Sequence, residues 1–325
     1  MGRRRPARTP ALHETAQAGE DAGAPAARVA LLVEFARPFT LLPPLIGFLS
    51  GSAAAAGAEP PLTGISWGFP ALGALMAALL NAASNGLNQL HDVEIDRIAK
   101  PGRPLPSERL DRAAAWTFTL TCWALALAAA WFVAPTGARE CFLIVLAGSL
   151  FVWMYSAPPL RAKRLGMLAN VTIAAPRGLL LTAAGWSAVR SVGNAEPWLL
   201  GLVFGLFLLG AATTKDFADV EADRAGGCRT LPVVHGLRGA AKRIAPFFVA
   251  PFLLLPAGAG LGLLTGNPQL LAVLGAGLAG YGAFTARLIL RRPHAFGADG
   301  NHVSWRHMYL LMMAAQFGLA TAYLL

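Results

Sequence analysis

Two nearly identical acidic segments organise this chain: Asp92-Val93-Glu94-Ile95-Asp96-Arg97 and Asp219-Val220-Glu221-Ala222-Asp223-Arg224. Each segment follows a long apolar stretch and precedes a basic loop. A second shared element comes after each of them, Arg103-Pro104-Leu105-Pro106 in the first case and Arg229-Thr230-Leu231-Pro232 in the second. The repeated order predicts a scaffold of two similar halves that brings two acidic helix ends together.

The composition around these segments is that of a membrane protein. Of 325 residues, 55% are hydrophobic and only 14% are charged, and the mean hydropathy is +0.52. A soluble domain carries nearer to about a quarter charged residues. The net charge of +10 would indicate nucleic acid in a soluble protein. Here the basic residues lie in short loops between apolar stretches, so they indicate orientation in a lipid bilayer and no nucleic-acid partner.

Nine apolar stretches are each close to the ~20 residues that a helix needs to cross a bilayer. We therefore predict an all-α polytopic membrane protein, with nine transmembrane helices in two parallel pseudo-repeats around a central cavity. Residues 1–28 lack apolar periodicity and predict a disordered basic cytosolic tail, followed by a membrane domain of residues 29–325. The expected spans are 29–56, 68–91, 113–134, 139–157, 165–187, 196–216, 243–264, 268–289 and 304–325.

Basic residues are distributed unevenly between the two sides of the predicted membrane domain. If the N-terminus is cytosolic, the loops on the opposite side contain only Arg139 and Arg190. Lys and Arg are enriched in cytoplasmic loops. This asymmetry predicts an integral membrane protein, which we expect in a bacterial cell membrane, with its N-terminus and both acidic segments on the cytosolic side.

The acidic residues predict a site for Mg²⁺ and a diphosphate. If the helices continue through the two segments, one face carries Asn88, Asp92 and Asp96. The corresponding face of the second segment carries Asp216, Asp219 and Asp223, whereas Glu94 and Glu221 point away. Mg²⁺ prefers oxygen ligands and is usually bound by one or two carboxylates together with substrate phosphates. Nearby Arg and Lys side chains are suited to the remaining phosphate oxygens.

Other interpretations of the acidic segments are weaker. Solvated helix ends paired with Arg97 and Arg224 would explain one segment, but not the same spacing and topology twice. An ion-coupled transporter would bind its ion near the bilayer midplane, whereas both segments are predicted at one face. A non-catalytic scaffold has no need of a duplicated acidic face.

The residues Asn88-Gln89-Leu90-His91-Asp92-Val93-Glu94-Ile95-Asp96 resemble the NxxxDxxxD motif of the UbiA superfamily of membrane prenyltransferases. Asp219-x-x-x-Asp223 is similar to that family's second DxxxD motif. Two shorter elements also resemble the family: Arg37-Pro38-Phe39-Thr40 its first helix, and Tyr155-Ser156-Ala157-Pro158-Pro159-Leu160-Arg161-Ala162-Lys163 the segment after its fourth. The likeness is colinear and covers about residues 30–325. It is greatest to the branches that prenylate chlorophyllide, homogentisate and archaeal glycerol lipids.

The resemblance implies a reaction and a set of site residues. The implied reaction is Mg²⁺-dependent transfer of a prenyl group from a prenyl diphosphate to an aromatic, quinone-type or other lipophilic acceptor, with release of diphosphate. The implied ligands of Mg²⁺ and diphosphate are Asn88, Asp92, Asp96, Asp219 and Asp223. The residues implied to contact phosphate or orient the leaving group are Arg37, Arg103, Tyr155, Arg161 and Lys163. Of these, Arg161 and Lys163 compete for one family position, and Asp216 is an additional carboxylate.

Three questions stay open at the level of sequence. A UbiA-type terpene cyclase would use the same metal motifs and differs in needing no second substrate. His91 stands where related sequences often have Tyr, and is either a base or a hydrogen-bond partner of the site. Arg177 lies within a predicted span, where an ionisable residue indicates a functional site by default, although a structural salt bridge would also explain it.

Overall fold

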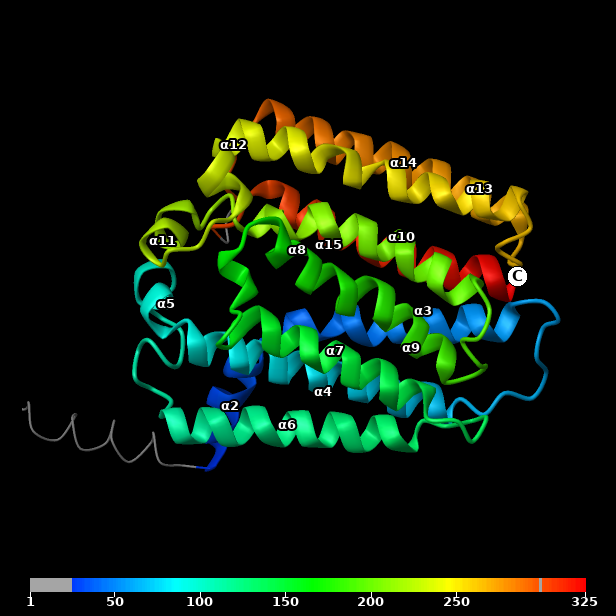
Figure 1. Ribbon diagram of the computed structural model, residues 1–325, viewed down its shortest axis with the longest axis horizontal. Helices are drawn as coiled ribbons and strands as arrows, with labels where there is room; N and C mark the ends of the chain where they lie inside the picture. The colour runs from blue at the N-terminus through cyan, green and yellow to red at the C-terminus, as the bar shows by residue number, and fades with distance from the viewer. Residues whose placement is uncertain (1–24, 298–299) are drawn as a thin grey trace, which may run out of the picture.

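The structure, a computed structural model, describes residues 25–297 and 300–325, and this part of the chain is nearly all helical (Figure 1). Its single β-bridge joins Phe296 and His302. The predicted tail lies mostly outside the described residues, but its last residues, 25–28, begin helix α2. The prediction of an all-α fold is confirmed.

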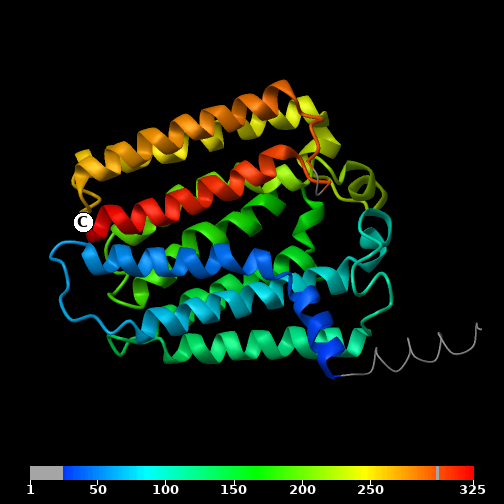
Figure 2. The same cartoon turned by 180° about the vertical axis from the view of Figure 1, so that it is seen from behind.

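Long helices run side by side and form the body of the molecule (Figures 1 and 2). The uninterrupted ones are α3 (Leu42–Gly57), α4 (Gly68–His91), α6 (Arg112–Phe132), α7 (Glu140–Ser156), α10 (Glu196–Ala211), α14 (Pro268–Arg291) and α15 (Val303–Leu324). Two more are assembled from shorter pieces. One comprises α8 (Met167–Ala174), the π-helical η3 (Ala175–Leu180) and α9 (Leu181–Ser187); the other comprises α12 (Leu231–Ile244), η5 (Ala245–Phe248), η6 (Ala250–Leu253) and α13 (Leu254–Gly260).

Six helical stretches of the described chain are long and apolar enough to cross a membrane. They are Pro38–Gly57, Arg112–Phe132, Met167–Ser187, Glu196–Lys215, Leu231–Gly260 and Pro268–Arg291. Helix α7 is apolar but shorter, and the long helices α4 and α15 contain several polar residues and are not among the six. The polytopic membrane architecture is therefore supported, whereas the predicted count of nine spans is not confirmed.

The predicted span 29–56 is wrong as a single helix. Helix α2 (Pro25–Ala36) ends before Arg37, whose backbone is left-handed (φ 59°), and the chain continues through η1 (Pro38–Leu41) into α3. Proline lacks a backbone N–H and disfavours the helical conformation of the residue before it, so Pro38 ends α2. Figure 2 shows α2 at a steep angle to α3.

The two acidic segments also interrupt their helices, so the continuous carboxylate faces that we predicted do not exist. Helix α4 ends at His91, and Asp92 caps the separate helix α5 (Val93–Ala99). Likewise η4 (Ala212–Lys215) ends before Asp216, and Asp219 caps α11 (Val220–Ala225). Aspartate is favoured at such caps. Neither carboxylate accepts a capping hydrogen bond, which leaves both free for other partners.

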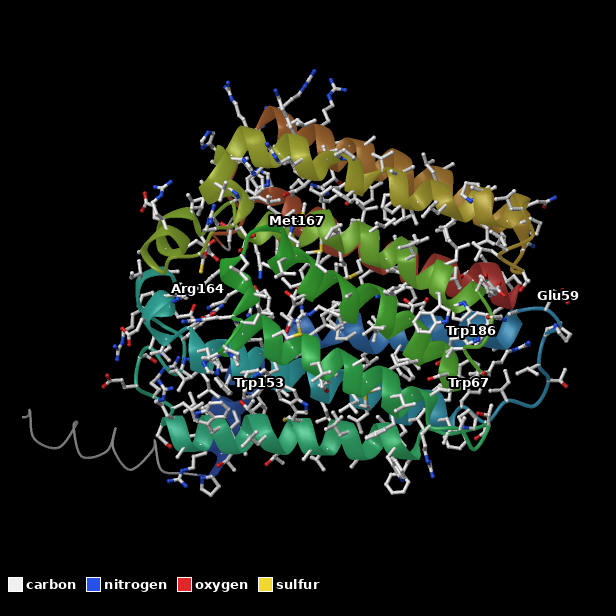
Figure 3. All side chains as sticks on the ribbon, in the orientation of Figure 1. Glu59, Trp67, Trp153, Arg164, Met167 and Trp186 are labelled. Carbon is white, nitrogen blue, oxygen red and sulfur yellow. The ribbon has the colours of Figure 1, made fainter. Side chains whose placement is uncertain are left out.

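Helices α5 and α11 lie against each other at one end of the bundle (Figure 1). A Cβ atom on Gly226, just after α11, would stand only 2.6 Å from Ile95 Cδ1 of α5. Figure 3 shows Arg164 at this end and Glu59 at the opposite end. The predicted meeting of the two acidic helix ends is thus confirmed.

Close backbone contacts hold the C-terminal helices together, and Gly282 on α14 makes one of them. An added Cβ would overlap the carbonyl oxygen of Phe248 in η5, whereas nothing lies within 4 Å of a Cβ on Gly277 of the same helix. Small residues permit such approaches between membrane helices.

We expect Gly282→Ala to lower the thermal unfolding temperature of the protein in detergent, because overpacking costs about 1–3 kcal/mol. The matched variant Gly277→Ala should leave the unfolding temperature unchanged or raise it slightly. Equal unfolding temperatures for the two variants would contradict the packing of α14 described above.

Candidate active site

A cavity of about 560 Å³ opens between the helices and is lined by both acidic segments. All five carboxylates that we predicted line it, as do five of the other predicted site residues. The lining site residues are Arg37, Asn88, Asp92, Asp96, Arg103, Tyr155, Lys163, Asp216, Asp219 and Asp223, joined by Asn85 from α4. Arg161 does not line the cavity but contacts Asp92 from outside it. The predicted exposed positions of Glu94 and Glu221 are confirmed.

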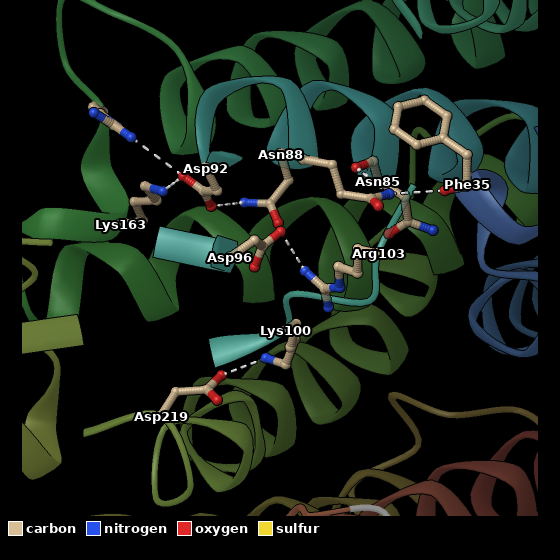
Figure 4. Close-up of polar contacts among 11 residues, drawn as sticks. Phe35, Asn85, Asn88, Asp92, Asp96, Lys100, Arg103, Lys163 and Asp219 are labelled. Atoms are coloured by element: carbon tan, nitrogen blue, oxygen red, sulfur yellow. Dashed lines mark hydrogen bonds and ion pairs between the residues drawn. The ribbon is translucent and has the colours of Figure 1, made fainter. Parts of the chain in front are cut away.

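Asp92 is held from three directions (Figure 4). Its Oδ2 atom accepts a hydrogen bond of 2.8 Å from Asn88 Nδ2. Its Oδ1 atom forms ion pairs with Lys163 Nζ and, at 3.2 Å, with Arg161 NH2. Arg161 also donates to the backbone carbonyl of His91. The sequence did not choose between Arg161 and Lys163, and in the structure both side chains contact the carboxylate of Asp92.

The loop after α5 supplies cations to both halves of the site. Arg103 NH1 lies 2.7 Å from Asp96 Oδ2, and Lys100 Nζ lies 2.8 Å from Asp219 Oδ2 in the second acidic segment (Figure 4). The sequence analysis did not identify Lys100 as a site residue. The sequence did contain a signal for Lys100, because this residue lies between the predicted site residues Asp96 and Arg103.

A second group of polar side chains surrounds the other acidic segment. Lys215 Nζ donates to the hydroxyl of Tyr155 at 2.9 Å, and the Thr230 hydroxyl donates to Asp223 Oδ2 at 3.1 Å. Burial raises the pKa of Asp216 to about 7, and burial together with nearby Asp219 raises the pKa of Asp223. The sequence analysis did not predict Lys215 as a site residue, although it predicted the adjacent Asp216.

Two of the predicted basic residues have left-handed backbones, Arg37 (φ 59°) and Arg161 (φ 43°). Such conformations cost free energy in residues other than glycine and are concentrated at functional sites. The turn at Arg37 is tied to α4 by Asn85, whose Nδ2 donates to Ala36 O at 2.9 Å and to Thr40 Oγ1 at 2.8 Å. Burial lowers the pKa of Arg37 to about 10.

His91 and Arg177, whose roles the sequence left open, lie in different surroundings. The His91 ring packs edge-on against Trp116, with centroids 5.9 Å apart, and does not line the cavity. This placement favours a supporting role over that of a base. Arg177 lines the cavity and is exposed to it. The alternative of a structural salt bridge finds no support, since none of the ion pairs in the described chain includes Arg177.

The carboxylates fit Mg²⁺ only in part. No three acidic, His or Cys side chains within residues 25–297 and 300–325 converge closely enough to enclose a metal ion. Instead, carboxylates of both acidic segments and the amide of Asn88 line one cavity. Mg²⁺ is commonly held by one or two carboxylates with substrate phosphates and water. The donor set therefore suits a metal that a bound diphosphate completes.

Comparison with known proteins gives consistent results at the levels of sequence and fold. The family model described as "UbiA prenyltransferase family" matches residues 42–322. The chain is 33% identical over 264 residues to digeranylgeranylglyceryl phosphate synthase of Thermococcus kodakarensis, covering 80% of this chain and 86% of that protein. It is 31% identical over 217 residues to the bacteriochlorophyll synthase 33 kDa chain of Cereibacter sphaeroides, covering 65% and 68%.

A solved structure with the same fold is a UbiA homologue from Archaeoglobus fulgidus bound to GPP and Mg²⁺. The match has a TM-score of 0.69 at 20% sequence identity and covers 90% of this chain and 99% of the other. The similarity in fold extends over nearly the whole of both chains.

Because the donor set is incomplete, we expect Mg²⁺ to bind weakly to the protein alone and roughly tenfold or more tightly with a non-reactive prenyl thiolodiphosphate. Isothermal titration calorimetry of the protein in nanodiscs measures both affinities. Asp219→Asn should reduce the increase in Mg²⁺ affinity that the thiolodiphosphate causes. Glu221→Gln, at an exposed position of the same short segment, should leave this increase unchanged. Equally tight binding with and without the diphosphate would contradict the proposed ligand set.

Proposed function

The chain belongs to the UbiA prenyltransferase family, and we propose that it transfers a prenyl group from a prenyl diphosphate to a lipophilic acceptor in an Mg²⁺-dependent reaction. The observation that carries this proposal is the meeting of two acidic segments, both paired with basic side chains, at one cavity that also has many apolar lining residues. As a member of this family the protein is an integral membrane prenyltransferase. From the distribution of Arg and Lys, we place its acidic end and N-terminus on the cytosolic side.

The acidic end of the cavity is the proposed diphosphate site. Asn88, Asp92, Asp96, Asp219 and Asp223 would hold Mg²⁺, which would neutralise charge on the leaving group. If Asp219 and Asp96 held the metal, Lys100 and Arg103 would be released from them and could donate to phosphate oxygens. Tyr155 accepts a hydrogen bond from Lys215, which leaves its own hydroxyl proton free to reach a phosphate oxygen.

Loss of diphosphate leaves an allylic cation, or a species close to it, that must be screened from water. Apolar side chains line the cavity away from the acidic end, among them Ile144, Val145 and Leu180. An electron-rich atom of the acceptor then captures the cation. We assign removal of the last proton to a carboxylate of the cavity, because His91 does not line it.

Transfer to a second molecule is preferred to cyclisation of the donor. The matching family is one of prenyltransferases, and the relatives described above are synthases of digeranylgeranylglyceryl phosphate and of bacteriochlorophyll. A terpene cyclase would share the metal-binding residues but would need no acceptor. The requirement for an acceptor is therefore the property that an experiment must measure.

We expect purified protein in nanodiscs to release diphosphate from a prenyl diphosphate only when both Mg²⁺ and an acceptor are present. The assay uses a panel of donor chain lengths and of phenolic, quinol and glycerol-lipid acceptors. Asp92→Asn should lower the rate by about 10²-fold or more, by loss of leaving-group stabilisation. Glu94→Gln, two residues away and exposed, is the matched control and should retain activity.

Release without an acceptor, accompanied by a cyclic hydrocarbon product, would instead identify a terpene cyclase. No release from any donor, together with ion uptake into proteoliposomes, would contradict the proposed function altogether.

A further inference from the structure

The break between α2 and η1 leaves backbone carbonyl groups without helical partners. The last carbonyl groups of an α-helix have no N–H group to accept from within the helix. Here Pro38, which has no N–H group, begins the next element, and Phe35 and Ala36 are buried. Buried carbonyl groups are costly unless they accept a hydrogen bond. Partners for the carbonyl groups around Arg37 must therefore come from another part of the chain.

Helix α4 supplies these partners from one face. Asn81, Asn85 and Gln89 are spaced four residues apart, and all three are buried. Gln89 Nε2 donates to the carbonyl of Phe35 at 2.8 Å, beside Asn85 (Figure 4). Asn81 Nδ2 donates to the carbonyl of Thr40 at 2.9 Å. The amides of α4 thus contact the chain both before and after the left-handed turn.

Asn85 acts on the turn itself through a chain of hydrogen bonds. Its Nδ2 atom donates to Ala36 O at 2.9 Å and to Thr40 Oγ1 at 2.8 Å. The Thr40 hydroxyl donates in turn to the backbone carbonyl of Arg37 at 2.8 Å. The chain ends on the residue whose backbone is left-handed, a conformation that costs free energy in an arginine. Gln89 has no such connection to Arg37, so its loss should not release the turn.

Arg37 presents a cation that the protein itself does not pair. Its side chain lines the cavity, and no ion pair or side-chain hydrogen bond within residues 25–297 and 300–325 includes its guanidinium group. Arg103 and Asp96 of the acidic end are among the charged groups that act on it. Ordering an arginine side chain when a ligand binds costs conformational entropy. A backbone that is already fixed leaves less of this freedom to be lost.

We propose that Asn85 and Thr40 are positioning residues for the donor diphosphate, because they hold the turn that carries the unpaired guanidinium of Arg37. The inference rests on the proposed function and assigns two further residues to the same site. Neither side chain has to touch the donor, since their hydrogen bonds end on the backbone of the turn. Guanidinium groups bind phosphate oxygens with parallel hydrogen bonds, and this geometry depends on where the turn places the side chain.

The test compares the binding of two probes to the protein in nanodiscs with Mg²⁺. One probe is a non-reactive prenyl thiolodiphosphate, and the other is the prenyl alcohol of the same chain length, which lacks the diphosphate. The ratio of their affinities is the selectivity for diphosphate. Arg37→Gln should lower this selectivity roughly tenfold or more, and Asn85→Ala should lower it by a similar factor. Thr40→Val removes only the hydroxyl bridge and should have a smaller effect in the same direction.

The double variant of Arg37→Gln and Asn85→Ala should be about as selective as Arg37→Gln alone, because both substitutions remove the same contact. Gln89→Ala is the matched control on the same face of α4. It should lower the unfolding temperature, because it leaves the buried carbonyl of Phe35 unpaired, and should keep the selectivity of the wild type. If Asn85→Ala does not fold, Thr40→Val tests the same connection with every amide of α4 in place.

An equal loss of affinity for both probes in Asn85→Ala and Thr40→Val would indicate a merely structural role and overturn the inference. Losses of selectivity that multiply in the double variant would also overturn it, because Asn85 would then act on the donor independently of Arg37.

The proposed function can fail separately. Selectivity that depends on Arg37 and Asn85, without acceptor-dependent diphosphate release, would support the positioning role and contradict prenyl transfer. Acceptor-dependent release together with wild-type selectivity in Asn85→Ala would support transfer and contradict the positioning role.

Discussion

Neutralisation of buried carboxylates at the helix ends is the constraint on which the site depends. A charge near a membrane is costly unless it is paired, hydrated or bound to a counter-ion. Here Asp92 is paired with Lys163 and Arg161, Asp96 with Arg103, and Asp219 with Lys100. The loops after α5 and α7 are therefore part of the site, since they supply these cations. The Lys100–Asp219 pair also joins the two halves.

The same constraint connects the resting structure with the proposed reaction. A metal ion and a diphosphate together bring both signs of charge, so each carboxylate and each cation can exchange its partner without being left unpaired. Folding has already removed these carboxylates and cations from water, so substrate binding does not have to supply that desolvation free energy. The strained backbones of Arg37 and Arg161 agree with a site whose cations are held in place in advance.

The helical membrane fold and the main carboxylates of the site were predictable, because both follow from patterns of residue type along the sequence. The apolar stretches predicted a helical membrane protein, and the repeated acidic segments predicted that Asp92, Asp96, Asp219 and Asp223 line one cavity. The helix breaks at Arg37, Asp92 and Asp219 were not predicted, because hydrophobic periodicity does not detect a change of direction in a polar stretch. Only Pro38 gave a local signal for one of them.

The partners of individual side chains depend on these breaks and were also beyond the sequence. Lys100 reaches Asp219 because α5 turns away from α4 and packs on α11. His91, one residue before the break, faces Trp116 instead of the cavity. Its neighbour Asp92, one residue later, faces the cavity. The position at which α4 ends therefore determines that Asp92, and not His91, lines the cavity.

The central claim is that the two acidic segments form one site, and a double-mutant cycle tests it directly. The cycle compares kcat/KM of the wild type, Asp92→Asn, Asp219→Asn and the double variant. Residues that act as a unit have strongly non-additive effects. The account predicts that the double variant loses little more activity than the more damaging single one. Losses that multiply, or full activity of Asp219→Asn, would contradict a single shared site.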